Sequence, residues 1–193
     1  MVLKCMRDMG LTRSTADPCM YYDWSQRGLV VIASWIDDNL IVGSKEAVAH
    51  TKKELMSRFE CEDCGELDEY VGCRITKLKG AIKFTQDVLI QSFVDEFELS
   101  SRKYATPAKS GNVLTKGDPE LVVDNGKQTY YRSGVGKMIH IMQWSRPDIC
   151  SAVRDLTRHM QSAMPAHIEA MHRAMAYCVR TREPGVTLRP NCS

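Results

Sequence analysis

The chain lacks any apolar run of the length that a membrane-spanning helix needs, which is about 18 residues or more. Residues 1–7 also lack the long apolar core of a secretory signal peptide. We therefore expect an intracellular protein, cytoplasmic or nuclear and not secreted, with no membrane among its partners.

A complete zinc-binding pattern is also missing. Of the eight cysteines, only Cys61 and Cys64 have the spacing of a zinc-ligand pair, and no second pair of cysteines or histidines follows at such a spacing. Two interpretations stay open: free thiols that pack as small apolar residues, or a small metal-binding interaction module built on Cys61 and Cys64. Stoichiometric zinc in the purified protein would identify the second.

The sequence has no glycine-rich phosphate loop, because Gly134 and Gly136 lie in a segment with a helical pattern. The histidines of the C-terminal part fit neither a zinc pair nor a Cys/His nucleophile arrangement; they are His140, His159, His167 and His172. We expect them at the surface or in satisfied packing positions.

What the sequence does contain is a β-hairpin with two carboxylates at its tip. Residues 29–36 are mostly apolar, Asp37 and Asp38 follow, and residues 40–43 resume the apolar pattern. Adjacent like charges repel unless a cation or solvent compensates them, and carboxylate oxygens suit Mg²⁺ or Mn²⁺. The pattern predicts metal-dependent nucleotidyl transfer. The alternative is a purely structural turn, because Asp and Asn are common turn formers.

Further sequence blocks stand in a fixed order around this hairpin. They are residues 16–21, 40–44, 59–67, 70–75, 106–107, 131–138, 145–149 and 152–153. Together with the aromatic-x-Asp-Asp pattern that begins at Trp35, they resemble the reverse transcriptase domain of copia-type LTR retrotransposons, in which Tyr is the usual aromatic residue. The resemblance covers about residues 9–185 and implies the later palm, the primer-grip hairpin, the thumb and the helices downstream of it.

The resemblance implies an RNA-directed DNA polymerase that adds deoxynucleotides to a primer 3′ hydroxyl. Asp37 would bind the catalytic Mg²⁺ or Mn²⁺, and Asp38 would contribute charge and secondary ligation. Trp35 would lie beside the primer terminus. The implied partners are an RNA or DNA template with a DNA primer, deoxynucleoside triphosphates, and the remainder of a polyprotein.

Residues 69–78 and 81–85, separated by Lys79 and Gly80, predict a second hairpin. By the resemblance it is the hairpin that grips the primer 3′ end, with Tyr70, Val71 and Gly72 at the nucleic acid. Gly72 would then allow a close backbone approach. From the residues alone, the alternative is a bent edge strand.

In this family a third metal-binding aspartate and the fingers lie on earlier segments, and no segment of this chain matches them. We therefore expect the isolated chain to be inactive in primer extension. The alternative function is a catalytically inactive remnant that at most binds nucleic acid. Loss of the fingers also predicts exposed apolar side chains, such as Val31 or Trp35, and a tendency to associate.

The fold class that we expect is α+β: an antiparallel palm-type sheet with packed helices, followed by a mainly helical C-terminal part. Residues 1–105 would form the partial palm with its thumb-type helix, 106–128 a linker, and 129–193 the thumb and connection helices. Strands are expected at residues 19–24, 29–36 and 40–43, and helices at 1–10, 45–59, 86–99, 130–144, 147–160 and 166–181. Residues 129–193 carry nine basic and four acidic side chains, which makes them a candidate phosphate-binding surface.

Overall fold

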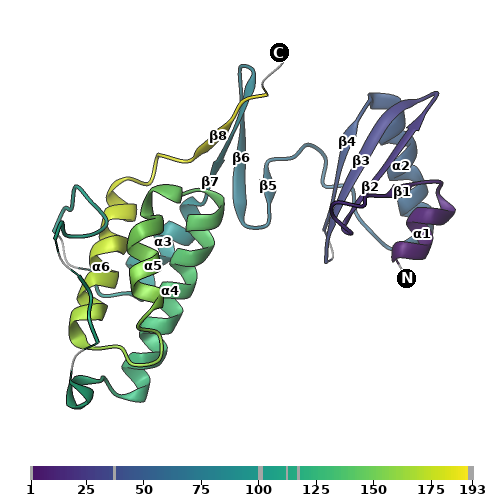
Figure 1. The fold of residues 1–193 in the computed structure, drawn as a ribbon. Coiled ribbons are helices and arrows are strands. Elements are labelled where there is room, and N and C mark those ends of the chain that lie inside the picture. The colour runs from purple at the N-terminus through teal and green to yellow at the C-terminus, as the bar shows by residue number, and fades with distance from the viewer. Residues whose placement is uncertain (1, 37, 100–101, 112, 117, 191–193) are drawn as a thin grey trace. The chain divides into compact units, whose positions relative to one another are not determined.

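The computed structural model describes residues 2–36, 38–99, 102–111, 113–116 and 118–190. The chain divides into two compact units, residues 1–66 and residues 67–193 (Figure 1). Both units contain an antiparallel sheet with packed helices, and the later part of the chain is mainly helical, so the predicted α+β class is confirmed. None of the described helices is long and apolar enough to cross a bilayer.

The first unit is a four-stranded antiparallel sheet, in the order β1-β2-β3-β4, with two helices. Its elements are α1 (Val2–Asp8), β1 (Thr12–Arg13), β2 (Met20–Ser25), β3 (Gly28–Trp35), β4 (Asp38–Gly43) and α2 (Lys45–Arg58). Ser44 begins α2 as predicted, because its side chain accepts a hydrogen bond from the Ala47 N–H. The predicted strands and both helices are confirmed, whereas β1 is too short to show a period in the sequence.

The core of the first unit lies on one face of its sheet. Alternation along β3 places Val30 and Ile32 on this face, with exposed fractions of 3% and 0%. They pack with residues of the two helices and of the segments beside them: Met6, Leu11, Tyr21, Ala47 and Leu55. The β3–β4 hairpin is thus anchored by its inward-facing residues.

The second unit contains another four-stranded antiparallel sheet, in the order β5-β6-β7-β8. Its strands are β5 (Glu69–Tyr70), β6 (Cys73–Leu78), β7 (Ala81–Thr85) and β8 (Val186–Leu188). The hairpin between β6 and β7 is confirmed, but the expectation of one continuous strand over 69–78 is wrong. The chain reverses at Val71 and Gly72, and β5 pairs back on β6.

Strand β8 was not predicted, although it lies along β7 and completes the sheet (Figure 1). Val186 pairs with Phe84, and Leu188 with Ile82. The approach is close, because a Cβ on Gly185 would collide with the Phe84 carbonyl oxygen. A glycine at this position therefore lets the end of the chain join the sheet.

The helices of the second unit enclose a single apolar core. They are α3 (Asp87–Glu96), η1 (Pro119–Leu121), α4 (Asn125–Trp144), η2 (Pro147–Ile149), α5 (Cys150–Thr157) and α6 (Pro165–Arg180). Fully buried side chains from α3, α4 and α6 meet in this core, among them Phe93, Tyr131, Met138 and Met171. The predicted helices are confirmed, with α4 beginning earlier than expected, at a cap formed by Asp124.

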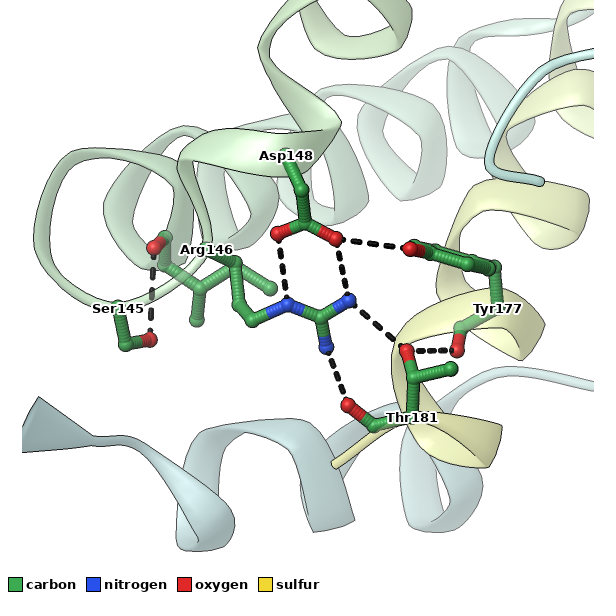
Figure 2. Close-up of polar contacts among 6 residues, drawn as sticks. Ser145, Arg146, Asp148, Tyr177 and Thr181 are labelled. Atoms are coloured by element: carbon green, nitrogen blue, oxygen red, sulfur yellow. Dashed lines mark hydrogen bonds and ion pairs between the residues drawn. The ribbon is translucent and has the colours of Figure 1, made fainter. Parts of the chain in front are cut away.

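The turn between α4 and α5 is held by a buried arginine (Figure 2). Arg146 is 1% exposed and donates two hydrogen bonds to the Asp148 carboxylate, at 2.8 and 2.7 Å. It also donates to the Thr181 carbonyl oxygen and hydroxyl, while the Tyr177 hydroxyl donates to Asp148. One guanidinium thus ties this turn to the C-terminal end of α6.

Candidate active site

The predicted carboxylate hairpin is present in the first unit. Strands β3 and β4 pair in register up to Trp35 and Asp38, which leaves a two-residue loop at the tip. Ile36, the first residue of that loop, has a φ of 50° and is 82% exposed. Two-residue hairpin loops favour positive φ because this backbone twist matches that of the strands. A bulky β-branched residue in that conformation is strained, so the register of the hairpin imposes it.

Asp37 lies outside the described residues. Asp38 is the first residue of β4, and its side chain is exposed. Trp35 is its direct partner across the hairpin and is 51% exposed. Directly paired residues of antiparallel strands point to the same face of the sheet, so Trp35 and Asp38 share a face. That face is opposite to the one that packs on the helices.

The strands fix the position of this tip. Val30 and Ile32 of β3 are buried against the helices, and Ile41 of β4 packs against the same cluster. The Ser34 N–H also donates to the Cys19 carbonyl oxygen at 2.9 Å, which ties the end of β3 to the start of β2. A carboxylate at the tip is therefore presented from a rigid support.

The chemistry of the tip fits a hard divalent cation only in part. Carboxylate oxygens are the preferred ligands of Mg²⁺ and Mn²⁺, and Asp38 offers one such group to solvent. Among the described residues no group of three or more His, Cys, Asp or Glu side chains is placed to hold a metal ion. Asp38 alone would supply only part of a ligand set, and a stable site would need further oxygen ligands.

The three residues predicted at the primer end, Tyr70, Val71 and Gly72, come together on one tight turn of the second unit. Tyr70 pairs with Cys73, and the two residues between them have φ values of 50° and 71°. Positive φ at both positions defines the turn type that two-residue hairpins favour. No described atom lies within 4 Å of a Cβ built on Gly72. Within the described chain, glycine is therefore favoured at this position by the positive φ and not by a close contact. This turn and the carboxylate hairpin belong to different units.

Sequence reasoning missed the conformation of Val71. A valine at a φ of 50° is a genuine outlier for a β-branched residue. The available signal was Gly72 directly before the buried Cys73, because glycine is typical of the second position of such a turn. Nothing in the identity of Val71 indicates positive φ.

Cys73 follows this turn and is not a nucleophile. Its side chain is fully buried, and burial, with the nearby Glu69 carboxylate, raises the pKa of the thiol to about 11. The thiolate is the reactive form of cysteine, so Cys73 stays protonated and inert near neutral pH.

Cys61 and Cys64 are exposed free thiols in the irregular segment that follows α2. Within the described residues they belong to no group of three metal-ligating side chains. The nearby Asp63 instead forms an ion pair with Lys52 at 2.6 Å, and this contact, with a backbone hydrogen bond from Gly65, lowers the pKa of Asp63.

The four histidines of the C-terminal part are buried or partly buried, and two of them lie deep in the second unit. His159 and His167 are 4% and 1% exposed, and their rings stack with centroids 3.9 Å apart. Burial, followed by the proximity of His159, lowers the pKa of His167. The sequence contained no signal for this stacking, because seven residues and a helix start separate the two histidines.

Comparison with known proteins points to one family. The family model described as reverse transcriptase (RNA-dependent DNA polymerase) matches residues 1–109. The chain is 26% identical over 180 residues to the retrovirus-related Pol polyprotein from transposon TNT 1-94 of Nicotiana tabacum, covering 89% of this chain and 14% of that protein.

Two further relatives agree. The transposon Ty5-1 protein of Saccharomyces cerevisiae is 26% identical, covering 92% of this chain and 58% of that protein. The retrovirus-related Pol polyprotein from transposon RE1 of Arabidopsis thaliana is 25% identical to this chain. The alignment covers 94% of this chain and 12% of that polyprotein. The chain therefore spans about one seventh of the tobacco polyprotein that it matches. No solved structure matches the chain.

Proposed function

The chain belongs to the reverse transcriptase family, in its copia-type retrotransposon branch, and from this we propose that the hairpin at Trp35–Asp38 presents catalytic carboxylates to a primer 3′ end. The observation that carries the proposal is the hairpin itself. Its inward residues are buried, Ile36 at its tip is exposed, and Asp38 and Trp35 lie directly opposite each other.

Asp37 and Asp38 would hold Mg²⁺ or Mn²⁺, whose charge, when bound, stabilises the attacking and leaving oxygens of nucleotidyl transfer. Asp38 provides the second carboxylate from the start of β4, where the sheet restricts its movement. Trp35, exposed on the same face, would pack against the terminal base pair or sugar of the primer.

Tyr70, Val71 and Gly72 would contact the primer strand from the turn between β5 and β6. A tight turn with strained backbone at Val71 is consistent with a binding role, because such strain persists only where the surrounding structure fixes it. The partners in this proposal are an RNA or DNA template, a DNA primer and deoxynucleoside triphosphates.

The isolated 193-residue chain is, in our proposal, inactive in primer extension. In-line displacement with two metal ions requires more ligands than Asp37 and Asp38 supply, and no third carboxylate joins Asp38 among the described residues. The alternative is a remnant that binds nucleic acid without chemistry, and the basic residues of 129–193 favour it. The described cysteines form no disulfides, which favours an intracellular location for the polymerase fragment and for the remnant alike.

The experiment distinguishes the catalytic role of the hairpin from the effect of the polymerase segments that the isolated chain does not contain. A chimera would carry residues 9–185 in place of the matching segment of the tobacco polyprotein, and primer extension would be measured with Mg²⁺. We expect extension that falls at least about a hundredfold in Asp37→Asn and in Asp38→Asn, because metal ions contribute several kcal/mol to the stabilisation of the transition state. Asp155→Asn, which removes an exposed carboxylate of α5, is the matched control and should have no effect.

A chimera whose extension is insensitive to both hairpin substitutions would contradict the proposal. An inactive chimera that still binds primer–template would favour the remnant instead. Extension by the isolated chain, dependent on Asp37, would show that its metal site is complete.

A further inference from the structure

The second unit contains a recess of about 470 Å³, lined by the segment that follows α3 and by the helices α5 and α6. This volume lies within the range of about 300–1,000 Å³ that is typical of small-molecule sites. Every residue that lines the recess belongs to the second unit, so its geometry is defined within that unit. None of these residues belongs to the carboxylate hairpin or to the turn between β5 and β6.

The helices give the recess an apolar floor. Ala166 and Ala170 lie four positions apart on α6 and therefore share a face of that helix, and Ala152 joins them from α5. Leu156, which is 1% exposed, adds a larger apolar side chain from α5. Because alanine side chains end at Cβ, they leave space between the helices and the segment that follows α3.

Arg173 of α6 holds the outer wall of the recess. The segment that follows α3 runs beside α6 (Figure 1), where the guanidinium carbon of Arg173 lies 4.4 Å from the centroid of the Tyr104 ring and Nη2 donates to the Thr106 hydroxyl at 3.0 Å. The Arg173 Nε–H is buried and has no acceptor among the described residues. Buried donors are usually paired, so an oxygen atom of a ligand is the acceptor that this wall lacks.

Charged side chains of both signs surround the apolar floor. Arg102 and Lys109 come from the segment that follows α3, whereas Asp155 and Glu169 come from α5 and α6. All four residues are exposed, and none of their side chains forms an ion pair or a hydrogen bond with another described residue. The recess thus has unpaired cations on one wall and unpaired carboxylates on the other.

We propose that this recess binds a short peptide segment that carries an apolar side chain between a carboxylate and a basic side chain. A ligand with charges of one sign would be attracted by two of the four charged lining residues and repelled by the other two. A ligand with both signs can pair with all four. Its carboxylate would lie toward Arg102 and Lys109, its basic group toward Asp155 and Glu169, and its apolar side chain on the floor.

The size of the recess also suits a peptide of about three residues. A cube of the same volume has an edge of about 8 Å, and the first and third Cα atoms of an extended peptide are roughly 7 Å apart. Three residues therefore carry the two charges and the apolar side chain over the length that the recess offers.

This inference goes beyond the proposed polymerase role and does not depend on it. The recess contains none of the residues proposed to act on the primer, so Asp155→Asn should still leave primer extension by the chimera unchanged. Peptide binding and primer extension are separate measurements, and failure of either leaves the other proposal intact.

The experiment measures the binding of blocked tripeptides to the full chain by saturation-transfer difference NMR, observed at the leucine methyl protons of the peptide. The first probe contains lysine, leucine and glutamate. Two comparison probes carry leucine between two lysines or between two glutamates. We expect the mixed-charge probe to bind about threefold to fivefold more tightly than either comparison probe, because each reversed charge loses a partly exposed ion pair.

Glu169→Lys reverses one charge of the helical wall. It should weaken binding of the mixed-charge probe and strengthen binding of the probe with two glutamates, so that the preference is exchanged. Ala166→Leu fills the recess from an exposed position of α6 and should weaken binding of all three probes, with unchanged far-UV circular dichroism. Glu120→Lys, at an exposed residue of η1 that does not line the recess, is the matched control and should leave the three affinities unchanged.

Three results would overturn the proposal. One is the absence of saturation transfer to any of the probes in the presence of the full chain. Another is equal binding of the mixed-charge and like-charged probes. The third is an order of preference that stays the same in Glu169→Lys, which would place the bound peptide outside the recess.

Discussion

Arg146 and Asp148 form a bidentate pair in which the guanidinium is almost fully buried and the carboxylate side chain is 41% exposed (Figure 2). Arg146 and Asp148 are only two positions apart in the sequence, yet Arg146 also donates hydrogen bonds to Thr181 at the end of α6. The hydrogen bonds from Arg146, the largest influence, lower the pKa of Asp148. The turn between α4 and α5 therefore depends on a charge that cannot be returned to water without opening the core.

Arg146→Ala should destabilise the second unit by about 1–3 kcal/mol, because it empties a buried position and leaves the Thr181 carbonyl oxygen without its donor. Arg146→Lys should recover only part of this loss, since a single ammonium cannot form the bidentate contact. Urea unfolding followed by circular dichroism measures both. Arg58→Ala, which removes an exposed pair with Glu54, is the control and should cost less than about 0.5 kcal/mol.

Gly134 and Gly136, both within α4, should respond oppositely to alanine. A Cβ on Gly134 would lie 2.5 Å from Met171 Sδ and 2.9 Å from a ring carbon of Phe97, in a fully packed core. Overpacking of this kind costs about 1–3 kcal/mol, which outweighs the gain in helix propensity of about 1 kcal/mol. A Cβ on Gly136 meets no described atom within 4 Å, so Gly136→Ala should stabilise α4 by up to about 1 kcal/mol.

Thermal unfolding of the two glycine variants, measured side by side, checks this pair of predictions. A Gly134→Ala variant as stable as the parent chain would mean that Met171 and Met175 can move away at little cost. Equal stabilisation by both substitutions would contradict close packing of α4 on α6.

The second unit should lose stability in mild acid because of its buried histidines. His167 accepts a hydrogen bond from the Met164 N–H through Nδ1, and its Nε2 faces the Thr115 carbonyl oxygen, so the folded state holds the neutral ring. Burial lowers the pKa of His167 and of His172 below the ordinary histidine value of 6.5. The unfolded chain thus binds protons first, and stability falls as the pH drops below about 6.5, by up to about 1.4 kcal/mol per pH unit for each histidine.

Free energies of unfolding at pH 7.5 and 5.5 measure this effect. His167→Gln should reduce the difference between the two values, because the substituted residue takes up no proton in this range. His50→Gln, at an exposed histidine of α2, should leave the difference unchanged. A stability that is independent of pH between these values would show that protonation of His167 costs nothing.

Local patterns were sufficient to predict the helices and the carboxylate hairpin, because both depend on residues close together in the sequence. The apolar alternation of β3 and the Ser44 cap are of this kind. The pairing of β8 with β7 joins segments about a hundred residues apart, and no local period marks three residues as a strand. The turn at Val71 was missed for a different reason: pairing of β5 with β6 overrides the preference of valine for extended backbone.

Replacing Val71 by asparagine should stabilise the second unit. Val71 has a φ of 50° and precedes Gly72 at 71°, so Val71→Asn creates the Asn-Gly pair that this turn type favours. Relief of a β-branched residue from the left-handed region is worth roughly 1–2 kcal/mol, measured as an upward shift of the urea midpoint. Gly72→Ala should have the opposite effect of similar size. If the strain at Val71 serves primer binding, the Val71→Asn variant should bind primer–template more weakly in the chimera although it unfolds at a higher urea concentration. An increase in both the affinity and the urea midpoint would assign the strain to the fold alone.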